Sequence, residues 1–206
     1  IPSNHEEWKD KIAIIGAGPA GLSAAYYLAL MGYRPTVFEK NQKPGGMMMY
    51  GIPSYKLEKD VLDAEIDIIR QLGVEIKTGI EVGKDVTIDS LKKEGYKAFY
   101  IAIGCQGGKR PGIKNDEAEG TIVAVDYLRE SFEDRMATFE GEVVVIGGGN
   151  VAVDCARNAH RFKSRKVSMF SLEDRENMPA SKEEIRETLE EGIEIHNSYG
   201  PKEILV

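Results

Sequence analysis

The chain has 206 residues, of which 42% are apolar and 30% are charged, and its formal net charge is −7. This composition is typical of a globular protein of one or two domains. The negative charge argues against non-specific binding to nucleic acid or to an anionic membrane, and no apolar run approaches the roughly 20 residues of a membrane span. Two cysteines are too few for a disulfide framework or a four-cysteine metal site, so we expect a reducing, cytoplasmic environment.

Short apolar runs alternate with amphipathic segments along the chain, which predicts alternating strands and helices. Glycines follow several of these segments and mark their ends. In chain order, we expect strands at 11–16, 35–39, 74–77, 96–103, 142–146, 167–170 and 193–195. We expect helices at 22–31, 61–72, 121–135, 153–162 and 181–191, and loops at 41–57 and 105–120. This order of elements is typical of an α/β protein.

One pattern of strand, glycine turn, helix and strand occurs twice. KIAIIGAGPAG in the first half returns as EVVVIGGGNVA in the second. The same offset of 131 residues separates Gly16 from Gly147 and Gly18 from Gly149. Two copies are too few for a solenoid, so they indicate two nucleotide sites.

Both turns have the chemistry needed to hold a pyrophosphate, because the N-terminus of a helix offers unpaired N–H groups and a positive dipole end. The first glycine allows the tight turn, the second lets the backbone approach the phosphates, and the third allows close helix–strand packing. Gly21 fills this third position in the first turn, and Ala152, an allowed variant, fills it in the second. Glu39 ends the second strand, where its carboxylate can accept hydrogen bonds from both ribose hydroxyls. In the second unit, Ser171 aligns with Glu39, and the acid is displaced by two residues to Glu173.

The joined motifs resemble a known family. The first turn is followed by PGGMMMYGIPSYKL, and the second unit contains IGGGNVAVDCAR and then ENMPAS. Together they resemble the family of the small subunit of bacterial glutamate synthase over nearly all of residues 10–206. The NADH-dependent ferredoxin–NADP reductases and the flavin module of dihydropyrimidine dehydrogenase are relatives in that family.

The resemblance implies two Rossmann-type dinucleotide-binding domains, with the NAD(P) domain inserted in the FAD domain. The FAD-binding domain would cover residues 10–135 and the NAD(P)-binding domain residues 140–206. Hydride would pass from NAD(P)H to FAD, and electrons would leave to an iron–sulfur domain or subunit. No catalytic residue is expected, because the cofactors carry the reaction and the protein binds and orients them.

The resemblance also assigns the residues of the two cofactor sites. At the FAD site it places Gly16, Gly18, Pro19, Ala20, Gly21, Glu39, Lys40, Gly45, Gly46, Met49, Tyr50, Gly51, Ile52, Pro53, Ala102, Ile103 and Gly104. At the NAD(P) site it places Gly147, Gly149, Asn150, Val151, Ala152 and Glu173.

The sequence differs from the family pattern at several places. Ile103 stands where threonine is usual, and Leu172 and Glu173 stand where NADPH-using members carry an arginine pair. Because Glu173 would repel a 2′-phosphate, we expect a preference for NADH, although Arg175 is close enough in sequence to oppose it. The chain has no initiator methionine and stops at Val206, so we expect a fragment that lacks the C-terminal part of the FAD domain and is inactive by itself.

The cysteines and histidines favour structural roles. Cys105 and Cys155 do not form a CxxC pair, and each is expected to be a small buried thiol rather than part of a dithiol relay. The three histidines, His5, His160 and His196, are scattered without metal-ligand spacing, so no metal site is expected.

Two further segments have more than one interpretation. Met47–Met49 can contact a flavin or simply pack in the core. The acidic stretch Glu183–Glu194 is expected to be a solvated helix face rather than a partner site.

Two other functions remain as alternatives to a reductase. One is a non-catalytic dinucleotide-binding module, such as a redox sensor or an assembly subunit. The other is an FAD oxidase or monooxygenase, and the second glycine turn argues against it.

Overall fold

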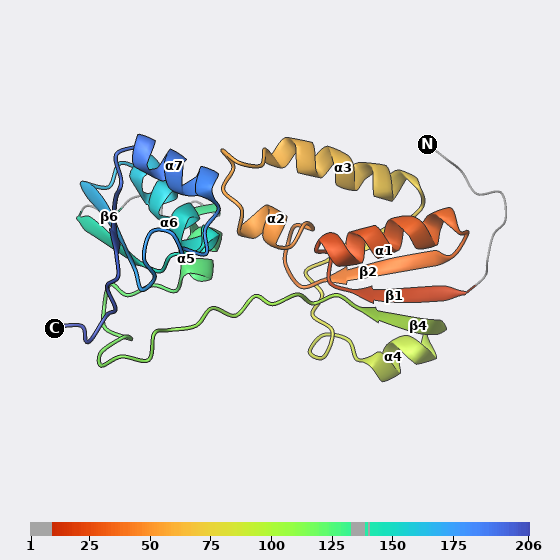
Figure 1. The fold of residues 1–206 in the computed structure, drawn as a ribbon. Helices are drawn as coiled ribbons and strands as arrows, with labels where there is room; N and C mark the ends of the chain where they lie inside the picture. The colour runs from red at the N-terminus through yellow and green to blue at the C-terminus, as the bar shows by residue number, and fades with distance from the viewer. Residues whose placement is uncertain (1–9, 133–138, 140) are drawn as a thin grey trace. The chain divides into compact units, whose positions relative to one another are not determined.

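The computed structural model describes residues 10–132, 139 and 141–206 and divides the chain into two compact units (Figure 1). The first unit ends at Gln106 and the second begins at Gly107. No helix in the described ranges has the length and apolar character that a membrane crossing requires.

The first unit is built on a four-stranded parallel sheet with the order β3-β2-β1-β4 (Figure 1). Its strands are β1 (Lys11–Ile15), β2 (Arg34–Glu39), β3 (Glu75–Thr78) and β4 (Tyr96–Ile101). Its helices are α1 (Pro19–Leu30), α2 (Met47–Tyr50), α3 (Lys59–Gln71) and α4 (Ile88–Lys93). The strands β1 and β2 are central, and every residue after the first in each strand is buried. Helix α1 lies against both strands, and α3 lies against α1.

The strand order of this sheet reverses between β1 and β4. The chain moves from β1 to β2 and β3 on one side and then returns to place β4 on the other side of β1. Ligands of open α/β sheets bind outside the carboxyl ends of the strands at such a reversal. The residues that follow Ile15 and Ile101 therefore lie where a ligand is expected.

The second unit has a three-stranded parallel sheet with the order β5-β6-β7. Its strands are β5 (Glu142–Ile146), β6 (Lys166–Ser171) and β7 (Glu194–Asn197). Its helices are α5 (Ala124–Phe132), α6 (Asn150–Arg161) and α7 (Lys182–Glu190). Helix α6 is buried from Ala152 to Ala159, because it packs against β5, β6, α5 and α7.

Helix α5 belongs to the second unit, which places the division of the chain earlier than the expected boundary between residues 135 and 140. Tyr127 and Leu128 are buried in the same apolar cluster as Val153 and Ala156 of α6. The apolar face of α5 therefore packs on α6, and the division falls at Gln106. The expected end of this helix, residues 133–135, lies outside the described residues.

Two short helices in the first unit were not expected. Helix α2 lies within the region expected to be a loop, and its Met49 and Tyr50 are buried. Helix α4 begins with a reciprocal cap: Thr87 Oγ1 accepts from the N–H of Ser90, and the N–H of Thr87 donates to Ser90 Oγ. The fully buried Leu91 then attaches α4 to the sheet.

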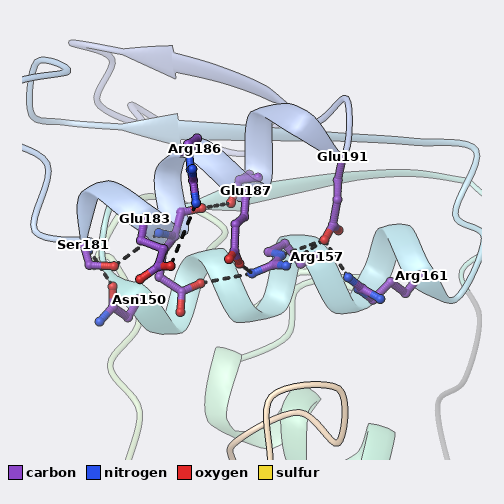
Figure 2. A network of polar contacts seen from close by, with 10 residues as sticks. Asn150, Arg157, Arg161, Ser181, Glu183, Arg186, Glu187 and Glu191 are labelled. Carbon is purple, nitrogen blue, oxygen red and sulfur yellow. Dashed lines mark hydrogen bonds and ion pairs between the residues drawn. The ribbon is translucent and has the colours of Figure 1, made fainter.

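The acidic stretch near the C-terminus does not form one solvated face, which corrects the expectation. Figure 2 shows Glu187 and Glu191 beside Arg157. Glu184 and Glu187 of α7 and its C-cap residue, Glu191, all form ion pairs with the buried Arg157 of α6. Their spacing of three and four residues is the signal for a common helix face. Glu190 lies on the exposed side of the same helix.

Candidate functional site

The first glycine turn packs at the strand reversal of the first unit. The N–H of Gly16 donates to the carbonyl of Phe38 at 2.8 Å, and Gly16 has a φ of +105° that L side chains rarely adopt. A Cβ added to Gly16 would overlap the carbonyl oxygen of Ala102, which follows β4. A Cβ added to Gly21 would overlap the carbonyl oxygen of Gly16. These two glycines are therefore required for the packing of the turn itself.

Gly18 has a different environment from its two neighbours. It is the N-cap of α1 with an ordinary φ of −76°, and a Cβ there would meet only the Cα of Gly46, at 3.9 Å. Pro19 and Ala20 follow it at the exposed start of the helix. Gly18 has no side chain that could accept from the first N–H groups of α1, so these donors suit an anion.

Glu39 is buried beside the turn, and its carboxylate already accepts hydrogen bonds from the protein. The N–H of Ala17 donates to Oε2, and both the backbone N–H and the side-chain amide of Asn41 donate to Oε1, each at 2.8 Å. A carboxylate offers about four acceptor positions. One ribose hydroxyl therefore fits on Oε2, whereas binding both hydroxyls requires Asn41 to release a position. Asn41 was not predicted from the sequence, although its place two residues after the acid is a usable signal.

The loop after β2 lies against the first turn. The N–H of Gly45 donates to the carbonyl of Ala17 at 2.7 Å, and a Cβ on Gly46 would lie 2.7 Å from the Cα of Gly18. The structure thus brings this double glycine and the turn together, and the approach of its N–H groups to a cofactor stays a prediction. Lys40 just before this loop is exposed.

The segment from Met49 to Pro53 is held by a lysine that the sequence analysis missed. Lys59 Nζ donates to the carbonyls of Met48 and Ile52, at 2.7 and 2.6 Å. Burial lowers the pKa of Lys59. Met49 is fully buried, which favours the packing role.

The other expected residues of this segment and of the β4 end differ in exposure. Tyr50, Gly51 and Pro53 are buried and Ile52 is half-buried. The N–H of Ala102 continues the β1–β4 pairing by donating to Ile15, whereas Ile103 and Gly104 are exposed.

The second glycine turn reproduces the first. The N–H of Gly147 donates to the carbonyl of Phe170 at 2.9 Å, in the same way as Gly16 and Phe38. Gly149 is the N-cap of α6 with a φ of −93°, and a Cβ there would meet nothing within 4 Å. The predicted repeat is confirmed in backbone detail.

Behind this turn, the third position is occupied by the buried methyl group of Ala152, and Val151 is exposed on the first turn of α6. The helix N-terminus is therefore open at Gly149 and packed at Ala152.

The displaced acid reaches back to the second turn. A Cβ on Gly148 would lie 2.9 Å from Oε2 of Glu173 and 2.5 Å from Oγ of Ser171. Ser171 Oγ donates to Glu173 Oε2 at 2.7 Å, and this hydrogen bond lowers the pKa of Glu173. Leu172 and Arg175 are exposed on the same segment.

The start of α7 is tied to the second turn. The N–H of Ala180 donates to the carbonyl of Gly148, and the N–H of Ser181 donates to Asn150 Oδ1, both at 2.9 Å. Figure 2 shows Asn150 and Ser181 facing each other at one end of the helix pair. The side-chain amide oxygen of Asn150 thus positions the segment before α7, a role that was not predicted from the sequence.

The two cysteines differ. Cys155 is buried in α6, and burial, with a smaller effect of Asp154, raises its pKa to about 12. Cys105 is exposed, which corrects the expectation of a buried thiol, because it follows β4 in a segment outside the core. Among the described residues, no three His, Cys, Asp or Glu side chains gather where they could hold a metal ion. His5 lies outside these residues.

Proteins with similar sequences include oxidoreductases whose names specify NADP(+) or NADPH. The NADP(+)-dependent formate dehydrogenase subunit beta of Moorella thermoacetica is 46% identical over 93% of this chain. The glutamate synthase [NADPH] small chain of Escherichia coli is 37% identical, also over 93%, so the expected resemblance is confirmed. The chain spans 27% and 43% of the lengths of these two proteins.

The fold likewise has solved counterparts. FprA from Mycobacterium tuberculosis, determined in complex with NADPH, superposes with a TM-score of 0.74 at 21% identity, over 88% of this chain and 47% of FprA. This likeness supports the Rossmann-type α/β fold. The sequence pattern of the pyridine nucleotide-disulphide oxidoreductases matches residues 10–205. The chain therefore belongs to the pyridine nucleotide-disulphide oxidoreductase family.

Proposed function

We propose that this chain is the cofactor-binding part of a flavoprotein that passes hydride from NAD(P)H to FAD and electrons onward to an iron–sulfur partner. One observation carries the proposal: Gly18 and Gly149 cap equivalent helices and leave space at equivalent points of two repeated turns. Two such turns suit two dinucleotides, which a reductase of this type requires.

Each of the two units would hold one of the two cofactors. The first unit would hold FAD, with the pyrophosphate at Gly18 and the start of α1, the ribose at Glu39, and the flavin side near the segment positioned by Lys59. The second unit would hold NAD(P)H at Gly149 and Asn150. When bound, the cofactors supply the hydride chemistry, and these residues bind and orient them.

NADH is the proposed nucleotide, although both relatives described above carry NADP(+) or NADPH in their names. The carboxylate of Glu173 lies beside Gly148, and its negative charge would repel a 2′-phosphate bound near it. The same carboxylate suits a 2′-hydroxyl, which can donate to it.

The electron acceptor is proposed from chemistry and from relatives. The two cysteines, Cys105 and Cys155, are too few for a four-cysteine cluster, and the proposed reaction passes electrons to another domain or subunit. The Moorella relative is by name one subunit of a larger enzyme. We place the reaction in the cytoplasm, which suits a chain with two free thiols.

Two matched variants test the proposal, because a Cβ at either position would approach no other atom closer than 3.9 Å. In the full-length protein, Gly18→Val is expected to abolish bound flavin, read from the visible absorbance of oxidised flavin, while NAD⁺ binding remains. Gly149→Val is expected to leave flavin in place and to abolish its reduction by NADH. Circular dichroism checks that both variants fold.

Normal flavin content in Gly18→Val would reject the assignment of the first unit. A full-length wild-type protein that binds NAD⁺ but never flavin would instead support the non-catalytic binding module.

A further inference from the structure

Ser171 is a buried polar residue at the position where the first unit has its acid. It follows Phe170 as Glu39 follows Phe38, and it is fully buried at the end of β6. Its hydroxyl donates to Oε2 of Glu173 at 2.7 Å. Where the first unit has one acid, Glu39, the second unit therefore has a serine and a glutamate that are hydrogen-bonded to each other.

The backbone around this pair is held by the end of β7. The N–H of Tyr199 donates to the carbonyl of Ser171 at 2.9 Å, and the N–H of Ser198 donates to the carbonyl of Glu173 at 3.1 Å. The side-chain amide of Asn197 contacts the same carbonyl of Glu173 at 3.4 Å. The backbone of the segment is therefore hydrogen-bonded on both sides of Leu172, and the remaining conformational freedom is rotation of the Glu173 side chain.

The Ser171 hydroxyl removes that freedom. A glutamate side chain has three rotatable bonds and loses conformational entropy when it is fixed, so a partner that holds it in advance reduces the cost on ligand binding. In the structure, the held carboxylate lies beside the backbone of Gly148, within the turn that caps α6. Without the serine hydroxyl, the carboxylate can rotate into solvent.

We propose that Ser171 is a positioning residue for nucleotide specificity: its hydroxyl holds the Glu173 carboxylate at Gly148, so that the second unit accepts a ribose 2′-hydroxyl and rejects a 2′-phosphate. This inference rests on the proposed function, in which the second unit binds the nicotinamide nucleotide. A fixed negative charge discriminates against a phosphate more strongly than a mobile one, because the mobile carboxylate moves away at little cost.

The test is equilibrium binding of NAD⁺ and of NADP⁺ by calorimetry, which needs no turnover. In the wild-type protein, NAD⁺ is expected to bind at least about tenfold more tightly than NADP⁺. Glu173→Gln is expected to reduce this ratio about tenfold and Ser171→Ala about threefold, in line with the loss of a charge and of one hydrogen bond. In Ser171→Ala/Glu173→Gln, the serine substitution is expected to add nothing, since it acts through the acid.

Two more variants separate positioning from a general structural effect. Glu173→Asp keeps the charge but shortens the side chain, so the carboxylate no longer reaches Ser171, and the ratio is expected to fall as in Ser171→Ala. Glu176→Gln removes the same charge from an exposed position on the same segment and is expected to leave the ratio unchanged.

An unchanged ratio in Ser171→Ala, or an equal effect of Ser171→Ala with and without Glu173, would overturn the inference and leave the proposed function standing. If the wild-type protein binds neither nucleotide, the proposed function fails as well.

Discussion

The N–H of Ala17 donates a 2.8 Å hydrogen bond to Oε2 of Glu39, and this bond ties the first glycine turn to the end of β2. The preceding residue, Gly16, donates to the carbonyl of Phe38, so two consecutive residues of the turn bond to two consecutive residues of the strand. Asn41 donates twice to the other carboxylate oxygen. Glu39 therefore shapes the turn before any ligand arrives.

Glu39→Gln is expected to destabilise the first unit. The amide group of glutamine offers one acceptor oxygen instead of two, so its NH₂ would face Ala17 or Asn41, which are donors. Because Glu39 is only 3% exposed, the unpaired donors stay buried, and we expect a loss of about 2 kcal/mol in the free energy of unfolding. Chemical denaturation followed by circular dichroism measures this loss.

The control for this experiment is Glu65→Gln, which makes the same change at an exposed position of α3. It is expected to alter the free energy of unfolding by less than about 0.5 kcal/mol. Equal effects of the two substitutions would mean that the Glu39 hydrogen bonds contribute nothing to stability.

The glycines of the first turn are expected to respond differently to alanine. Gly21→Ala forces a methyl group onto the carbonyl oxygen of Gly16, and we expect a loss of about 3 kcal/mol in the free energy of unfolding. Gly18→Ala finds open space and an ordinary φ, so only the weaker N-cap matters, at about 1 kcal/mol or less. Thermal and chemical denaturation of the two variants measure which loss of unfolding free energy is larger. A larger loss for Gly18→Ala would contradict the close packing of Gly21 on Gly16.

The repeated turns were predictable because their causes are local. A continuous apolar run favours a buried parallel strand, and the glycine spacing is dictated by the approach of a helix to that strand. Such constraints leave a direct trace in the sequence, and so the predicted strand–turn–helix units are confirmed. The strand β4 was also predictable, but its place beside β1 depends on the whole topology.

The details of the candidate sites were less predictable because they depend on contacts between distant residues. The contacts of Lys59 with Met48 and of Asn150 with Ser181 join segments that no periodicity connects. Likewise, the sequence placed Glu173 two residues away from the aligned position, and only the side-chain geometry brings it to the turn. The membership of α5 in the second unit follows from packing against α6, which composition does not reveal.

Arg157 is expected to contribute much more to stability than Arg161. The Arg157 side chain is 7% exposed and contacts Glu184, Glu187 and Glu191, at 3.2, 2.7 and 2.7 Å (Figure 2). Arg157→Ala leaves these carboxylates facing one another near α6, and we expect a loss of about 3 kcal/mol or more in the free energy of unfolding. Arg161 shares Glu191 but is 44% exposed, so Arg161→Ala is expected to cost less than about 1 kcal/mol.

Chemical denaturation of both arginine variants at neutral pH measures the difference. Equal losses would show that the contacts of the buried arginine are offset by the cost of removing it from water.

The same network predicts a loss of stability in acid. Burial acts to raise the pKa of Glu191, but hydrogen bonds and charge from Arg157 and Arg161 outweigh it and hold the pKa below its ordinary value of 4.5. Because the folded-state pKa is lower than the unfolded-state value, the stabilisation is complete above pH 4.5 and is lost as the pH falls through the lowered pKa. The free energy of unfolding of the wild-type protein is therefore expected to fall steeply below this pH.

Glu191→Gln removes this titration and should flatten the profile of unfolding free energy against pH in this range. Glu190→Gln, on the exposed side of α7, should keep the wild-type slope. Parallel profiles for wild type and Glu191→Gln would show that Glu191 does not couple folding to protonation.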